Sequence, residues 1–220
     1  MALSKLTYNS LNVTAAASKG IGFDSDPDAL QADYTAGAMT FIKKLTADGS
    51  GSSLSFVDGS SNVVLDSTYK EYLFTFKNIH PGTNNIKFQF NLSVDSGSNY
   101  NVAKTTTFFK TQHNEGDTVT DLSYSGGRDL AQGTGVQILE ENLGNDNDQN
   151  LSGYLRLFNP SSTTFVKHFM ARFSDHLQDD AAVDAFIAGY ANTTSAVDAI
   201  RFSVNSGNID AGDICLYGIK

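Results

Sequence analysis

The residues whose spacing best suits ligand chemistry lie in the acidic segment GNDNDQN, residues 144–150. Asp146, Asp148 and Asn150 occupy alternate positions, as the first three oxygen ligands of a calcium-binding loop do. The pattern then departs from a calcium loop, because Leu151 replaces the glycine and Leu157 replaces the bidentate glutamate. The segment therefore predicts a solvated turn, and the sequence leaves open whether the Asp146–Asn150 loop binds an ion.

The histidines and the single cysteine indicate no metal site and no other cofactor. The four histidines are His80, His113, His168 and His176. His168 and His176 are eight residues apart, which places them on one face of a continuous strand but too far apart to share a metal ion. Cys215 has no second cysteine with which to form a disulfide or a zinc site, so a core position near the C-terminus is expected.

Two segments contain the residue types of hydrolases. Ser174, Asp175 and His176 are consecutive in FSDHL. Neighbouring strand residues point to opposite faces, so Ser174 and Asp175 cannot both reach His176 from the same side. Glu140 and Glu141 are adjacent in the same way and do not make the facing carboxylate pair of a glycosidase. The glycine pairs do not continue into a dinucleotide or phosphate-binding motif. The sequence therefore predicts a protein without enzymatic activity.

Composition narrows the class of protein further. The chain has 220 residues, a net charge of −9 and a pI near 4.7, which argues against nucleic acid or anionic membranes as partners. It contains twenty Asp and four Glu residues, and this imbalance favours turns over helices. Nothing near Met1 reads as a signal peptide, and no stretch is long and apolar enough to cross a membrane.

From residue 38 onward, apolar and polar residues alternate with a period of two. The alternation is clearest in NIKFQFNLSV, where apolar residues at 86, 88, 90, 92 and 94 predict a core-facing row and the polar residues between them predict a solvated face. Candidate strands span residues 38–47, 53–57, 69–79, 85–94, 102–111, 135–140, 151–158, 165–176, 197–204 and 212–219. The segment QDDAAVDAFIAGY, residues 178–190, fits a short helix or a strand.

About ten short strands without a βαβ rhythm predict an all-β, antiparallel sandwich or barrel, for which a jelly roll is the commonest large form. We expect a β-sandwich. The apolar residues Ile214, Leu216 and Ile219 lie almost at the C-terminus. We therefore expect the last strand to complete a sheet and to be buried there.

Residues 1–37 differ from the sandwich segment 38–220, because they are rich in small residues and lack the alternation. Asp26 and Pro27 offer one helix start. We interpret the segment as an extended N-terminal arm that lies on another surface. Its candidate interface residues are Leu3, Leu6, Tyr8, Leu11, Val13, Ile21 and Phe23.

Several motifs occur together in a fixed order: STYKEYLFTFKNIHP, NLSVDSGSNYNV, GNDNDQNLSGYLRLFNPSSTTFVKHF, AGYANTTSAVDAIRFSVNSGNID and LYGIK. In this combination the chain resembles a group of β-rich virion structural proteins of tailed bacteriophages, especially marine phages that infect cyanobacteria. The resemblance covers roughly residues 38–220, and the segment NSLNVTAAASKGIGF of the arm is similar too. It transfers no catalytic residues.

The resemblance implies a virion component without naming its place. We expect a structural protein on the particle surface, made in the cytoplasm of the host bacterium. Both a capsid decoration and a compact tail-appendage or fibre module remain open. The alternative is a lectin-like module that binds host glycans, which nine tyrosines favour and the lack of tryptophan disfavours. The expected partners are further copies of the chain, by analogy as a homotrimer, other virion proteins, and a host glycan or receptor.

Overall fold

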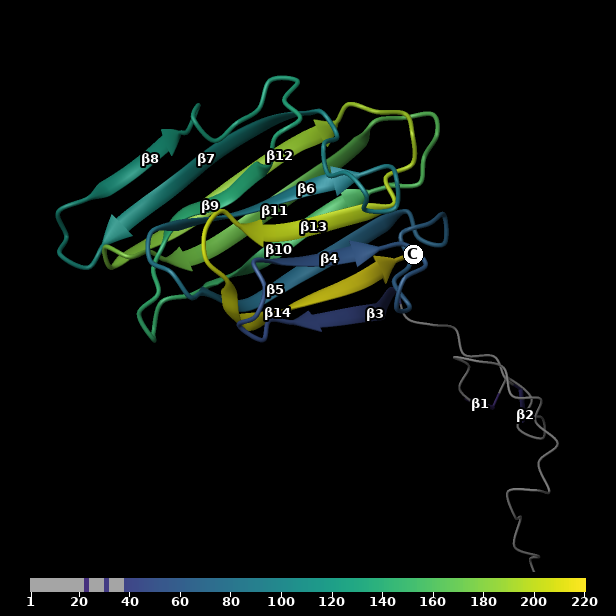
Figure 1. Ribbon diagram of the computed structural model, residues 1–220, viewed down its shortest axis with the longest axis horizontal. Coiled ribbons are helices and arrows are strands. Elements are labelled where there is room, and N and C mark those ends of the chain that lie inside the picture. The colour runs from purple at the N-terminus through teal and green to yellow at the C-terminus, as the bar shows by residue number, and fades with distance from the viewer. Residues whose placement is uncertain (1–21, 24–29, 32–37) are drawn as a thin grey trace, which may run out of the picture. The chain divides into compact units, whose positions relative to one another are not determined.

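The chain divides into two units, Met1–Gly37 and Ala38–Lys220. The structure, a computed structural model, describes residues 22–23, 30–31 and 38–220 (Figure 1). In the first unit, the short strands β1 (Gly22–Phe23) and β2 (Leu30–Gln31) pair in antiparallel fashion. The expected helix start at Asp26 and six of the seven arm residues lie outside the described part, and Phe23 is described only as a member of β1.

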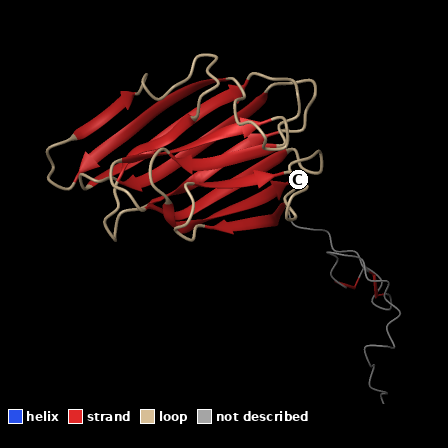
Figure 2. Ribbon diagram, in the orientation of Figure 1, coloured by secondary structure: helices blue, strands red, loops and turns tan. Residues whose placement is uncertain are grey.

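The second unit is all-β, and no helix occurs among the residues that the structure describes (Figure 2). Its strands are β3 (Met39–Thr46), β4 (Ser53–Val57), β5 (Glu71–Pro81), β6 (Ile86–Ser93), β7 (Lys104–Asn114), β8 (Thr120–Tyr124), β9 (Gln137–Leu143), β10 (Leu151–Phe158), β11 (Lys167–His176), β12 (Ala181–Ala191), β13 (Ala199–Val204) and β14 (Ile209–Ile219). They form two packed antiparallel sheets, which confirms the prediction of an all-β sandwich.

The larger sheet has eight strands in the order β3-β14-β5-β10-β11-β12-β7-β8, and the smaller has four in the order β4-β13-β6-β9. Along the chain, β3 to β6 alternate between the two sheets, and so do β9 and β10 and then β13 and β14. The strand pairs β7–β8 and β11–β12 both join the larger sheet and widen it by four strands. The larger sheet therefore has one face toward the smaller sheet and a second, broad face turned away from it.

Phenylalanine rings fill the space between the two sheets. Phe76 on β5 and Phe202 on β13 meet edge to face with their ring centroids 4.8 Å apart. Phe88 and Phe90 on β6 are fully buried, as their alternation predicts, and Phe90 contacts Phe169 of the opposite sheet at 5.1 Å. Such edge-to-face pairs stabilise the core beyond the burial of area alone.

Most of the terminal strand is buried as expected, but Ile219 lies on the opposite side of the strand from Leu216 and is only partly buried. β14 lies between β3 and β5, and both Ile214 and Leu216 are fully buried in the core. Cys215 is buried as well, on the opposite side of the strand, and it is a free thiol. The strand therefore stands inside the larger sheet and not at its edge.

Segment 178–190, which fits a helix or a strand by sequence, belongs to β12, where Ala181, Val183, Ala185 and Ile187 alternate into the core. The sequence did not predict β8, because its residues are mostly exposed and polar, as suits an edge strand.

Two expectations for the strand over residues 85–94 were wrong. Val94 was expected in the core but is 39% exposed, since β6 ends at Ser93. Asn91 and Ser93 were expected to meet water but are buried. The Asn91 amide donates to the Tyr100 and Thr134 carbonyl oxygens, so loops cover this end of β6.

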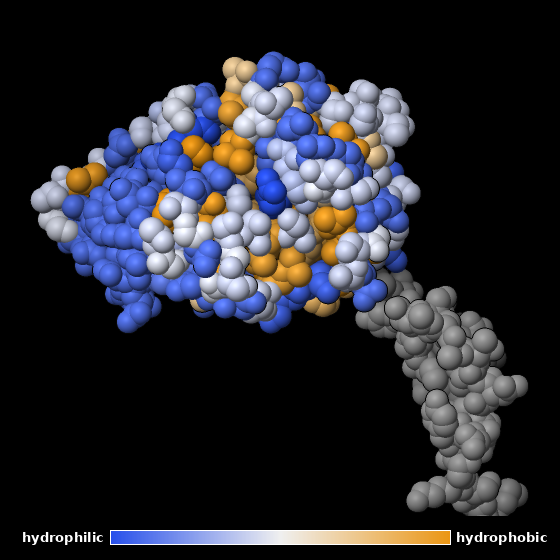
Figure 3. All heavy atoms as spheres, in the orientation of Figure 1, coloured by the Kyte–Doolittle hydropathy of each residue, from blue (hydrophilic) through white to orange (hydrophobic). Residues whose placement is uncertain are grey.

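On the side shown in Figure 3, hydrophilic residues dominate at the end where β7 and β8 lie.

Candidate binding site

We call the side of the eight-stranded sheet that faces away from the smaller sheet the outer face. Strand alternation and register place on this face seven of the ten large hydrophobic side chains that are exposed in the described part of the chain. These seven are Met39, Phe41, Phe109, Leu122, Tyr124, Tyr154 and Met170. Exposed apolar side chains that gather on one face are a feature of binding surfaces, so this face is the candidate site.

A row of large side chains crosses the outer face from β10 to β8. The strand registers align, in this order, Tyr154, Arg172, Phe186, Phe109 and Tyr124. The rings of Phe109 and Phe186 are stacked with centroids 4.8 Å apart and planes inclined by 2°, and the Arg172 guanidinium lies 4.7 Å from the Phe186 centroid. We call this row the aromatic ridge.

The Arg172 guanidinium also donates hydrogen bonds to both carboxylate oxygens of Asp184, at 2.9 and 2.6 Å. This fork geometry fixes the side chain over the ring of Phe186 and neutralises its charge locally. It also raises the pKa of Arg172, so the cation is kept. The ridge is therefore a preorganised surface of aromatic rings around one paired cation.

Beside the ridge, small side chains leave the surface hollowed. Two hollows of about 540 and 600 Å³ adjoin there and share His113, Ser174 and Ala182. Ser152 lines the first and Leu122 the second, so that together they reach from β10 to β8. We call the two hollows together the polar trough.

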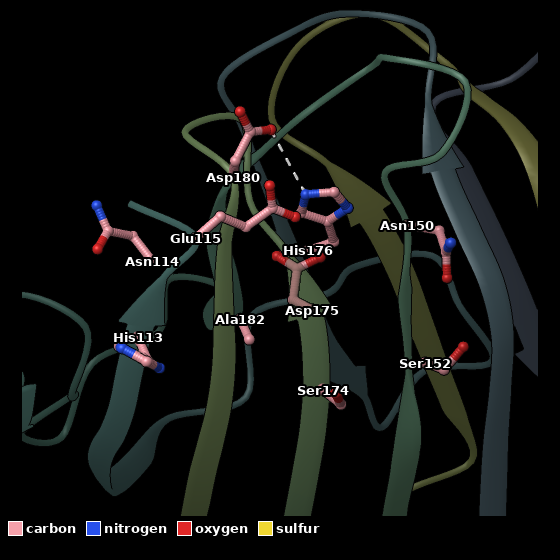
Figure 4. Close-up of a pocket in the computed structure, with 10 residues that line it drawn as sticks. All are labelled: His113, Asn114, Glu115, Asn150, Ser152, Ser174, Asp175, His176, Asp180 and Ala182. Atoms are coloured by element: carbon pink, nitrogen blue, oxygen red, sulfur yellow. Dashed lines mark ion pairs between the residues drawn. The ribbon is translucent and has the colours of Figure 1, made fainter. Parts of the chain in front are cut away.

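Charged groups gather at one end of the trough. Figure 4 shows Glu115, His176 and Asp180 grouped there, away from Ser152 and Ser174. The Nε2 atom of His176 lies 3.5 Å from Asp180 Oδ1. In the part of the chain that the structure describes, no three His, Cys, Asp or Glu residues are grouped so as to hold a metal ion.

The histidine and FSDHL predictions agree with this geometry. His168 lies near the other end of β11, where its ring is 6.0 Å from that of Tyr190, so it shares no site with His176. Ser174 and His176 face the trough. Asp175 borders the first hollow as well, but it is only 4% exposed, and its strand neighbours Leu151 and Val183 are core residues. The alternation of β11 therefore directs Asp175 to the face opposite to that of Ser174 and His176.

A second feature, a pair of buried carboxyl groups, has no signal in the sequence. Glu140 on β9 is fully buried, and burial raises its pKa to about 7. Burial first, and then the neighbouring charge of Glu140, raise the pKa of Asp175 to about 8. Neither oxygen of Asp175 accepts a hydrogen bond from a described side chain or backbone group. Lys110 and Arg128 lie close enough to favour the ionised form of Glu140, but burial outweighs them.

We therefore expect the sandwich to lose stability as pH rises from about 5 to about 8. Both carboxyl groups have pKa values in the folded state above their ordinary values of 4.5 and 3.8, so the folded state binds more protons than the unfolded state in this window. The stabilisation is complete below the ordinary values and is lost as pH passes through the raised ones. Urea unfolding at several pH values measures the slope.

The variants Glu140→Gln and Asp175→Asn keep the shapes of the two side chains and remove their titration. Each should flatten the pH dependence, and the double variant more so. His80 contributes with the same sign and is replaced by Gln in a separate control. A double variant that retains the full slope would contradict this assignment.

The acidic loop is tied to a histidine. Although burial opposes protonation of His80, a 2.6 Å contact between its Nδ1 atom and Asp210 helps to raise its pKa. The Nε2 atom lies 3.1 Å from the Asp146 carbonyl oxygen, which fits a ring that donates from both nitrogens. Leu151 is fully buried as the first residue of β10, so the position at which a calcium loop has its glycine belongs to the core here.

The fold and the outer face thus define a β-sandwich protein with a broad face that exposes aromatic side chains. Comparison of the chain with protein-family models, curated proteins and solved structures finds no match. Within the described residues there is no helix that would be able to span a membrane.

Proposed function

We propose that the chain is a non-enzymatic structural protein on the surface of a bacteriophage particle, either a capsid decoration or a compact tail-appendage module. The observation that carries this proposal is the outer face, where tyrosine, phenylalanine, methionine and arginine side chains lie exposed on a rigid sheet. These residue types are enriched where proteins associate with partners. The resemblance of the sequence motifs to phage structural proteins supplies the kind of particle.

The strand order supports a jelly roll as the finer fold. The strands β3, β14, β5 and β10 face β4, β13, β6 and β9. Successive strands of this set of eight alternate between the sheets, except that β6 and β9 are neighbours in the smaller sheet. We propose that these eight strands form a jelly roll, into which the pairs β7–β8 and β11–β12 are inserted. The insertions carry most of the aromatic ridge, so they are the part of the fold that adapts it to a partner.

The location is tested on purified particles of the phage that encodes this chain. Mass spectrometry of the particles and a density map should find the chain in stoichiometric amounts, as a symmetric homo-oligomer that contacts other virion proteins. Absence of the chain from washed particles would overturn the proposal. Sedimentation of the isolated protein tests the homotrimer.

Deletion of residues 2–24 should leave the sandwich folded and impair its assembly or its incorporation into particles. The deleted segment contains seven large apolar residues, which we propose as anchors on a neighbouring subunit or virion protein. The thermal transition of the truncated protein and its recovery in particles measure the two effects. Normal incorporation of the truncated protein would show that the segment is not an anchor.

A further inference from the structure

We propose that the polar trough binds a linear, neutral glycan that lies across the strands from β8 to β10, beside the aromatic ridge. Glycan binding goes beyond a structural role on a particle. It is a property of the sandwich alone and does not depend on where the chain is located. The trough, the ridge and the charges around them each restrict what the ligand is.

The dimensions favour an extended ligand. The trough crosses five adjacent strands, and with strands about 4.8 Å apart it is roughly 19 Å long. Its floor is low because Ser152, Ser174 and Ala182 carry small side chains. The aromatic ridge runs parallel to the trough, two residues along each strand, and does not itself line the hollows. A chain of several sugar rings would lie lengthwise between the ridge and the turns that follow β7 and β11.

The chemistry of the lining matches a polyhydroxylated ligand. Hydroxyl groups of Ser152 and Ser174, the Asn150 amide and the His113 ring both donate and accept hydrogen bonds, as sugar hydroxyls do. Leu122, which is 71% exposed, adds an apolar contact at the β8 end. The ridge adds aromatic rings that are 39% exposed at Tyr154 and 58% exposed at Tyr124. Aromatic faces beside a few placed polar groups suit the apolar faces of pyranose rings.

The charges select a neutral ligand. Among the described residues that line the two hollows there is no lysine and no arginine. The cation of the ridge, Arg172, donates hydrogen bonds to both carboxylate oxygens of Asp184. Glu115 and Asp180 stand at one end of the trough, on a chain with a net charge of −9. Acidic polysaccharides and nucleic acids would be repelled from this surface.

Protein partners fit the trough less well than a glycan does. A peptide cannot add a strand there, because the backbone groups of β10, β11, β12 and β7 are already paired on both sides. A second copy of the chain would need apolar, complementary surface, and that lies on the other side of the ridge. There an apolar hollow of about 490 Å³ is lined by Phe158, Met170 and Tyr190.

Calorimetric titration of the full chain with neutral oligosaccharides of four to six units tests the proposal. The panel contains oligomers of glucose in α-1,4 and β-1,4 linkage, of mannose and of N-acetylglucosamine, with an acidic uronate oligomer and a single-stranded oligonucleotide as comparisons. At least one neutral oligomer should bind with a Kd below about 1 mM. Tyr124→Ala and Phe109→Ala should each weaken this binding about tenfold or more. Ser174→Tyr, which fills the floor of the trough, should abolish it.

Phe41→Ala is the matched control, because Phe41 is 56% exposed on the same sheet but lies on β3, four strands away from β11. It should leave the affinity unchanged, and unchanged thermal transitions confirm that all variants fold. The proposal is overturned if no neutral oligomer binds at about 10 mM, or if Ser174→Tyr binds like the parent. It is also overturned if the chain forms an oligomer that Ser174→Tyr dissociates, since a second copy would then occupy the trough. The absence of the chain from phage particles would leave these titrations unaffected.

Discussion

Removal of residues 214–220 is expected to abolish the cooperative folding of the sandwich. These residues form most of β14, which pairs with β3 on one side and with β5 on the other. Their loss would separate β3 from the rest of the sheet and leave the backbone groups of β5 unpaired. It would also remove Ile214 and Leu216 from the core, where both are fully buried. A central strand contributes more than the few kcal/mol by which such domains are stable.

Circular dichroism, a thermal scan and the soluble yield measure this outcome. A chain that lacks only the exposed Lys220 is the control and should melt close to the full-length protein. If the protein without residues 214–220 remains soluble and melts cooperatively at the parent temperature, β14 is dispensable and the described register is wrong.

Replacement of Phe88 or Phe90 by alanine should lower the free energy of unfolding by about 3–5 kcal/mol. Both rings are fully buried between the sheets, where Phe88 meets Phe76 at 5.7 Å and Phe90 meets Phe169 at 5.1 Å. Alanine leaves a cavity among side chains that are held in place by both sheets. Urea unfolding of each variant measures the loss.

The control lies on the same strand. Gln89 is only partly buried, and its amide makes a 3.3 Å hydrogen bond to the Ser203 hydroxyl. Gln89→Ala should therefore cost about 1 kcal/mol. Equal costs at positions 88 and 89 would indicate that another subunit buries the opposite side of β6.

The sequence by itself determined most of the strands and much of the core. Alternation of apolar and polar residues depends only on the pleat of the backbone, which directs successive side chains to opposite faces. It therefore placed Phe88, Phe90 and Leu216 inside, and it separated Ser174 from Asp175. Alternation could not find β8 at the sheet edge, because the outward and inward positions of that strand are both polar or exposed.

Only the tertiary structure decided the ridge, the trough and the buried carboxyl pair. Tyr154, Arg172, Phe186, Phe109 and Tyr124 come from five strands, and their order in space follows the strand register and not the order along the chain. Each of these residues looks like an ordinary outward position until its neighbours across the sheet are known. Glu140 and Asp175 likewise lie close enough for their charges to interact because β9 packs against β11, and burial raises the pKa of both. Cross-strand contacts join residues that are distant in sequence, and local periodicity does not specify which strands will be neighbours.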